Sequence, residues 1–252
     1  MRKTIGMAVL LLLVPARGAG QAVRGESSFV VVLDPGHGGT NTGAAGVVEG
    51  LYEKRFTLAL SRAVAERLRR EPDVRVVLTR EDDRYVTLRE RVRRANQIKA
   101  DVLVSIHANA SPSRSQRGFE TYVLSPEALE VDARALRSED GPPRPEVPPR
   151  VASILDDIER GTAQGLSVRL AERIQARLAR VRGDAGNRGV KQGSMDVLMG
   201  PTMPAVLVEV GFIDHPLEGA ELLKRETRTA IADALAAAVL DFREVLRETE
   251  DN

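Results

Sequence analysis

Two of the three histidines in this chain, His37 and His107, each follow a short apolar run of the kind that forms a buried strand. Imidazole nitrogens are good zinc ligands, and a catalytic zinc site commonly combines two histidines with one carboxylate and leaves its fourth position to water. Glu53, at the start of the first predicted helix, is a plausible carboxylate ligand. The spacing of these residues forms no compact motif, so two polar loop histidines remain the alternative to a metal site.

Glu209 is the next chemically informative residue, because it lies between Val208 and Val210 in the apolar run AVLVEVGF. A carboxylate buried in an apolar strand is costly without a partner. We therefore expect a metal ion or a water molecule near Glu209. His37, His107 and Glu209 all lie in or directly after predicted strands, and ligands of open α/β sheets gather beyond the carboxyl ends of such strands.

The glycines around His37 also allow a phosphate-binding interpretation, since backbone amides after a strand can hold anions. The details argue against it. Asn41 stands where a dinucleotide-binding motif needs glycine, and Ala44 stands where a Walker loop needs lysine. The sequence therefore disfavours nucleotide binding.

The candidate residues must be positioned by strands and helices that the sequence pattern predicts. Apolar or alternating runs indicate strands, amphipathic segments indicate helices, and a Thr87–x–x–Glu90 capping box supports the start of the second helix. This alternation predicts a single α/β domain with a mostly parallel or mixed sheet of about six strands, flanked by helices. The predicted strands are 28–33, 74–79, 101–106, 118–124 and 206–210, and the predicted helices are 55–70, 87–98, 166–181 and 227–246.

The composition limits the class of protein. The chain has 252 residues, of which 42% are hydrophobic and 29% are charged, as in an ordinary globular domain. A formal net charge of +1 gives no electrostatic basis for a nucleic-acid partner. No apolar run approaches the roughly 18 residues of a membrane span. Collagen-like, disordered and integral-membrane classes are thereby excluded.

Residues 1–20 have the pattern of an export signal, in which two basic residues precede the apolar stretch 5–14 and small residues follow. A short membrane anchor is the alternative, but the stretch is too short for one. We expect a signal peptide over 1–20, a mature domain over 21–247 and an acidic tail over 248–252. The chain has no cysteine, so an exported form must be stabilised by its core or by a metal. We expect a periplasmic or extracellular location.

Six segments spread over about residues 29–245 carry recognisable motifs. They are LDPGHGGTNTGAAG with the EK that follows it (33–54), LTREDDRYVTLRERVRRAN (78–96), ADVLVSIHANAS (100–111), NRGVKQ (187–192), DVLM (196–199) and PAVLVEVGFIDHPLEGAELL (204–223). In this order they resemble the zinc-dependent N-acetylmuramoyl-L-alanine amidases of bacterial cell-wall hydrolysis and cell separation.

The resemblance implies a site and a reaction. It implies one zinc ion per chain, held by His37, Glu53 and His107, with Glu209 as the general base and then general acid. The implied substrate is peptidoglycan, cut at the amide between the lactyl group of N-acetylmuramic acid and L-alanine. Two alternatives stay open: a catalytically silent wall-binding or regulatory module, and a zinc peptidase that cuts within the stem peptide.

Four further residues in these motifs carry weaker expectations. Asp34 is expected to cap the turn that follows it or to orient the His37 loop through a hydrogen bond. Asn109 and Lys191 are expected to contact the substrate, with solvated loop positions as the alternative. His215 is expected to be an exposed loop residue and not a metal ligand.

A proline-rich insertion, residues 125–165, precedes the helix predicted at 166–181. Long irregular connections within a compact domain are usually functional or disordered. Its parts 133–141 and 154–171 resemble a regulatory segment of the cell-separation amidases, which covers the active site until a partner protein withdraws it. The resemblance makes Glu139 a possible inhibitory zinc ligand and implies an activator protein. A solvated acidic loop is the alternative.

Overall fold

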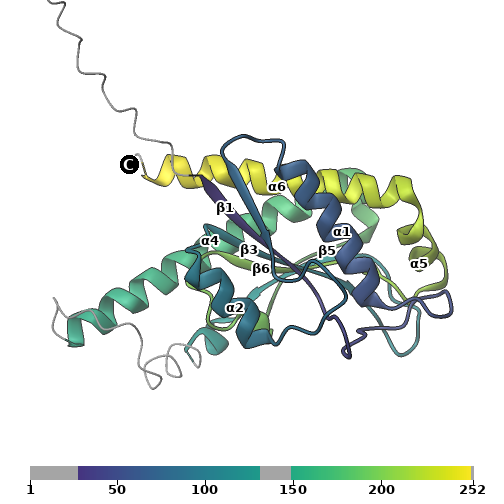
Figure 1. Ribbon diagram of the computed structural model, residues 1–252, viewed down its shortest axis with the longest axis horizontal. Coiled ribbons are helices and arrows are strands. Elements are labelled where there is room, and N and C mark those ends of the chain that lie inside the picture. The colour runs from purple at the N-terminus through teal and green to yellow at the C-terminus, as the bar shows by residue number, and fades with distance from the viewer. Residues whose placement is uncertain (1–27, 131–148, 251–252) are drawn as a thin grey trace, which may run out of the picture.

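The computed structural model describes residues 28–130 and 149–250, so the predicted signal peptide and Glu139 lie outside the described residues. The described chain forms one α/β domain (Figure 1). Its strands are β1 (Phe29–Pro35), β2 (Val74–Leu78), β3 (Val102–Asn109), β4 (Phe119–Leu124), β5 (Asn187–Gly193) and β6 (Ala205–Phe212). Its helices are α1 (Glu53–Leu68), α2 (Leu88–Gln97), α4 (Pro149–Arg182), α5 (Pro216–Leu223) and α6 (Arg225–Glu250).

The six strands form one mixed sheet in the order β2-β1-β3-β6-β4-β5, which confirms the predicted fold class. The strands β2, β1, β3 and β6 are parallel, whereas β4 runs antiparallel to β6 and β5 runs parallel to β4. The carboxyl ends of β1, β3 and β6 therefore meet the amino ends of β4 and β5 at one edge of the sheet. Side chains from five strands can reach a common site there.

Two hydrophobic clusters, one on each face, hold the sheet between layers of helices. The larger cluster joins one face of the sheet to α1, α4 and α6, and includes Val31, Leu60 and Phe242. The smaller cluster lies on the opposite face, where Ala95 of α2 packs with residues such as Leu103. Figure 1 shows α1 and α6 on one side of the sheet and α2 on the other. Among the described helices, none combines the length and the apolar character needed to cross a membrane.

The prediction of an irregular connection over 125–165 is wrong for much of its length. Residues 126–130 are helical, and α4 begins at Pro149 rather than at 166. Proline is tolerated in the first turn of a helix, and the chain from 150 to 165 contains none. The early part of α4 extends beyond the sheet in Figure 1, and its Ile158 is 59% exposed. Residues 158–165 are exposed or half-buried, so this stretch lacks the amphipathic pattern that reveals a helix.

Three other elements differ from the expectations. The edge strand β5 was not predicted, because it is polar and contains two glycines. The helix α5 was also not predicted, and His215 is its N-cap, whose Nδ1 accepts hydrogen bonds from Leu217 N (3.2 Å) and Glu218 N (3.1 Å). His215 is thus a half-buried helix cap rather than an exposed loop residue. Finally, α6 continues to Glu250 and includes residues 248–250 of the expected tail.

Candidate metal centre and active site

His37, Glu53 and His107 come together at the edge where the strands end. Their ligand atoms all lie within 4.8 Å of one another. Glu53 Oε2 is 2.9 Å from His37 Nε2, and Glu53 Oε1 is 2.9 Å from His107 Nδ1. His37 follows β1, Glu53 begins α1 and His107 lies near the end of β3, which is hydrogen-bonded to β1. The structure thus assembles the three residues that the resemblance assigned to a metal.

The donor set fits a zinc ion. Two imidazole nitrogens and one carboxylate are typical protein ligands of a catalytic zinc. The second ring nitrogen of His37, Nδ1, is 2.9 Å from Asn41 Oδ1, and metal-binding histidines usually use their other nitrogen in such a bond. Burial alone raises the pKa of Glu53, but its hydrogen bonds with His107 and His37 outweigh burial and lower the pKa, which favours the carboxylate form. Asn41 is thus a functional candidate that was not expected from the sequence.

Glycine makes this convergence possible at Gly36 and Gly43. A Cβ atom on Gly36 would lie 2.3 Å from His107 Cε1. A Cβ atom on Gly43 would lie 2.6 Å from Glu53 Oε2 and 2.6 Å from His37 Cδ2, and Gly43 also has a φ of +67°. Neither position has room for a side chain, so the backbone itself forms the wall of the site.

Glu209 lies beside this centre on β6. It is directly opposite His107 on β3 and Glu120 on β4. Its Oε2 is buried and has no hydrogen-bond partner within residues 28–130 and 149–250. Burial first, and then the charges of Glu53 and Glu120, raise the pKa of Glu209 well above its usual range. A carboxyl group in this state holds a proton more readily than an ordinary glutamate and can exchange it with a neighbouring group.

Glu120 is a second acid at the site, and it too was not expected from the sequence. It is 3% exposed and accepts hydrogen bonds from Asn109 Nδ2 (2.9 Å), Tyr122 Oη (3.0 Å) and Arg188 Nε (2.8 Å). Burial and the neighbouring Glu120 charge raise the pKa of Tyr122 to about 12, so Tyr122 remains a donor. Glu120 and Glu209 are therefore neighbouring acids in contrasting environments. Glu120 accepts three hydrogen bonds, whereas Oε2 of Glu209 accepts none from the described residues.

The weaker candidates have mixed positions. Asp34 is 1% exposed and bonds to Thr79 Oγ1, Ser105 Oγ (2.7 Å) and Arg91 Nη1 (2.7 Å), so these bonds go to neighbouring elements and not to the turn after β1. Asn109 donates a hydrogen bond to Glu120, the residue that pairs with Glu209 across β4 and β6. Lys191 is exposed on β5, paired in register with Tyr122.

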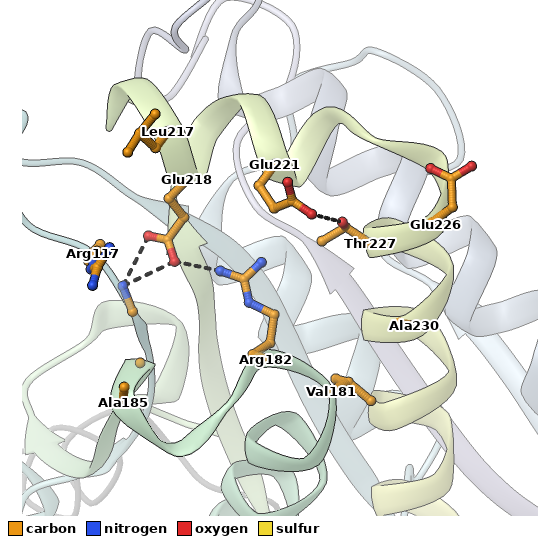
Figure 2. Close-up of a pocket in the computed structure, with 12 residues that line it drawn as sticks. Arg117, Val181, Arg182, Ala185, Leu217, Glu218, Glu221, Glu226, Thr227 and Ala230 are labelled. Carbon is orange, nitrogen blue, oxygen red and sulfur yellow. Dashed lines mark hydrogen bonds and ion pairs between the residues drawn. The ribbon is translucent and has the colours of Figure 1, made fainter.

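Glu218 of α5 connects the end of β6 to the chain just before β4, the two strands that carry Glu209 and Glu120. Its carboxylate accepts hydrogen bonds from Phe212 N (2.8 Å), at the end of β6, and from Gly118 N (3.0 Å), just before β4. Figure 2 shows Glu218 pointing toward Arg182 of α4, with which it forms an ion pair. These residues border a cavity of about 610 Å³ that does not include the metal-ligand candidates in its lining. Glu218 therefore acts at the ends of the strands that carry Glu209 and Glu120.

Comparisons with known proteins agree with this geometry. A family model described as N-acetylmuramoyl-L-alanine amidase matches residues 31–241. The chain is 32% identical over 227 residues to a probable N-acetylmuramoyl-L-alanine amidase AmiB of Haemophilus influenzae, covering 85% of this chain and 52% of that protein. It is also 32% identical over 229 residues to the uncharacterized protein YqiI of Bacillus subtilis, covering 91% of this chain and 90% of that protein. The chain thus spans about half the length of the first relative and most of the second.

A solved structure is similar as well. The catalytic domain of CwlV, an N-acetylmuramoyl-L-alanine amidase from Bacillus (Paenibacillus) polymyxa var. colistinus, is 31% identical to this chain with a TM-score of 0.66. The match covers 86% of this chain and 98% of that domain. The family match over residues 31–241 includes all four candidate residues, His37, Glu53, His107 and Glu209.

Proposed function

Because this chain belongs to the N-acetylmuramoyl-L-alanine amidase family, we propose that it hydrolyses the amide between N-acetylmuramic acid and L-alanine in peptidoglycan, using one zinc ion. The observation that carries the proposal is the convergence of His37, Glu53 and His107 beside Glu209. A set of zinc ligands next to an acid with a raised pKa is the minimum machinery for hydrolysing an amide.

His37, Glu53 and His107 would hold the zinc, which when bound supplies polarisation of the amide carbonyl and activation of water. Glu209 acts as the general base and then as the general acid. It accepts a proton from the attacking water as the carbon–oxygen bond forms, and it delivers that proton to the nitrogen as the carbon–nitrogen bond breaks. The products are a lactyl carboxylate and a free L-alanine amino terminus.

The geometry favours Glu209 over Glu120 for this role. The oxygens of Glu120 accept hydrogen bonds from three neighbouring side chains, which leaves little capacity for a proton from water. In contrast, Oε2 of Glu209 is buried without a partner in the described part of the chain. Glu120, together with Asn109, instead supports the strand next to Glu209.

The alternatives are distinguishable. The complete set of ligands and base argues against a silent wall-binding module. A zinc peptidase that cuts within the stem peptide would use the same ligand types, so only the products separate it from an amidase.

We expect the purified, zinc-loaded protein to release L-alanine amino termini from peptidoglycan, and Glu209→Ala to release none. Amino-terminal analysis of the soluble fragments measures this directly. Release of other amino termini would replace the amidase by a peptidase. If zinc binds but neither the full chain nor a form without residues 131–148 cuts the wall, the binding module becomes the better proposal.

We propose that the chain is exported to the periplasm or the cell exterior, where its substrate lies. The support is the sequence of residues 1–20. A role in daughter-cell separation, with an activator protein as a partner, belongs to the same proposal and rests on the resemblance of residues 133–141 and 154–171 to the regulatory segment.

Autoinhibition by Glu139 has its own test. A carboxylate on the open zinc position displaces the reactive water, so removing it is expected to raise activity. We expect Glu139→Gln, and deletion of 131–148, to increase the rate of wall hydrolysis several-fold. The deletion starts at 131 and leaves 126–130 in place, because Ala128 is 5% exposed and belongs to the second core cluster. Unchanged rates in both variants would rule out the inhibitory role.

A further inference from the structure

Two buried arginines lie behind the loop that carries His37. Arg80 follows β2 and is 0% exposed, while Arg91 belongs to α2 and is 3% exposed. We infer that they are positioning residues, which fix His37 for metal binding by holding the backbone carbonyls of three consecutive residues. This inference rests on the proposed zinc site.

The hydrogen bonds to the loop run in an unbroken series. The carbonyl of Pro35 accepts from Arg80 Nε (3.0 Å) and Arg91 Nη1 (2.7 Å). The carbonyl of Gly36 accepts from Arg80 Nη2 (2.7 Å), and the carbonyl of His37 accepts from Arg91 Nη2 (2.6 Å). Every peptide plane from 35 to 37 is therefore oriented by a guanidinium group.

The orientation matters because His37 has a φ of 61°, in the left-handed region that non-glycine residues rarely adopt. Such a conformation persists only where the surroundings determine it. With its carbonyl turned toward Arg91, the side chain of His37 is directed to Glu53, at 2.9 Å. The backbone strain is thus tied to the direction of the imidazole ring.

Arg80 also connects this loop to the helix that carries Glu53. Its Nη2 donates to the Lys54 carbonyl (2.8 Å) and to Thr57 Oγ1 (3.1 Å), both in α1, as well as to Gly36. One guanidinium therefore sets the distance between the loop of His37 and the start of α1. Arg80 thereby links the two elements that carry these ligands, through hydrogen bonds to Gly36 on one side and to Lys54 and Thr57 on the other.

Burying two like charges is costly, which argues that the arrangement serves the site. Asp34 compensates Arg91 through an ion pair of 2.7 Å. Burial first, and then the charge of Arg91, lower the pKa of Arg80 to about 10. A buried charge is weak support for stability by itself. Lysine cannot replace either residue, because a single ammonium group does not reach the several acceptors that the planar fork of arginine serves together.

The test is zinc affinity in Arg91→Lys, measured by competition with a chromogenic chelator on folded protein. We expect the zinc dissociation constant to rise 10- to 100-fold, the effect typical of residues that orient metal ligands. Two neighbours on α2 serve as controls. Val92→Ala shortens a buried side chain and lowers thermal stability, and Arg93→Lys changes a residue with a 51% exposed side chain. Neither control should change zinc affinity.

Several outcomes would overturn the inference. An Arg91→Lys protein with wild-type zinc affinity would do so, as would an equal loss of affinity in Val92→Ala, which would indicate general destabilisation. If Arg91→Lys does not fold, Arg80→Lys leaves the Asp34 ion pair in place and carries the same expectation. Absence of zinc binding by the wild type overturns this inference and the proposed function together. Zinc binding without release of L-alanine termini, by both the full chain and the form without residues 131–148, overturns the proposed function alone.

Discussion

Glu209→Gln is expected to lower kcat/KM for peptidoglycan hydrolysis by about 10²- to 10⁴-fold, the contribution typical of a general acid–base residue. The amide keeps the shape of the side chain but cannot accept and deliver the proton. Because Glu209 is not one of the three ligand candidates, zinc affinity should stay near that of the wild type. Rates are compared by the appearance of L-alanine amino termini. A variant with wild-type activity would remove Glu209 from the reaction.

The same substitution is expected to stabilise the metal-free protein at neutral pH. The pKa of Glu209 is raised well above the ordinary value of 4.5, so the folded state keeps a proton that the unfolded chain releases. The free energy of unfolding of the wild type therefore falls as pH rises from about 4.5 through the folded pKa. The amide group of the variant does not titrate, so the variant should lack this decline. Melting temperatures of both proteins from pH 5 to pH 8, in the presence of chelator, test this.

Glu120→Gln is the matched control, since it changes the residue opposite Glu209 in the same way. The Glu120 carboxylate accepts hydrogen bonds from Arg188, Asn109 and Tyr122. In the glutamine variant, the NH2 group is itself a donor and cannot accept any of these hydrogen bonds. We expect destabilisation of about 1–3 kcal/mol, the usual cost of an unsatisfied buried polar group. Stabilisation by Glu120→Gln, or none by Glu209→Gln, would contradict the contrast between the two acids.

Gly36→Ala is expected to lower the rate of hydrolysis by about 10²-fold or more, because the added methyl group has no room beside His107. The new Cβ would lie 2.3 Å from His107 Cε1 and 2.5 Å from Nε2, closer than real Cβ contacts allow. The backbone angles of Gly36 lie outside the left-handed region, so alanine is acceptable there apart from this collision. The His107 ring must therefore move, and a displacement of about 1 Å at a reacting centre costs about 10²-fold in rate.

Both zinc affinity and the rate of hydrolysis should fall in Gly36→Ala. The free energy of unfolding of the metal-free protein should fall by about 1–3 kcal/mol, because the added methyl group overpacks the site. Gly165→Ala, in α4, is the matched control, because a Cβ atom added there would meet no neighbouring atom of the described chain within 4 Å. Alanine in an exposed helix is expected to add up to about 1 kcal/mol of stability and to leave zinc affinity unchanged. If Gly36→Ala bound zinc as the wild type does, the proposed packing of His107 against the loop would be wrong.

The sequence alone determined the features that depend on short stretches of chain. Runs of β-branched residues predicted the buried strands, because strands packed on both faces are apolar throughout. His37 and His107 each follow such a strand, which predicted that they lie at one edge of the sheet. The apolar residues around Glu209 predicted a metal ion or a water molecule beside it, because a buried carboxylate without a partner is costly. Resemblance of the same local motifs then joined Glu53 to the two histidines.

Tertiary structure decided what depends on pairing between distant segments. That Glu120 faces Glu209 follows from the register of two antiparallel strands, and a shift of one residue would turn either side chain to the opposite face. The contacts of Arg80 and Arg91 with the His37 loop depend on how β2 and α2 pack beside β1. Hydrogen bonds to backbone carbonyls leave no trace in the identity of the accepting residue, so no local pattern could reveal them. Residues 158–165 of α4 and the polar edge strand β5 were not predicted for a related reason, since a segment without fully buried side chains carries no periodic apolar signal.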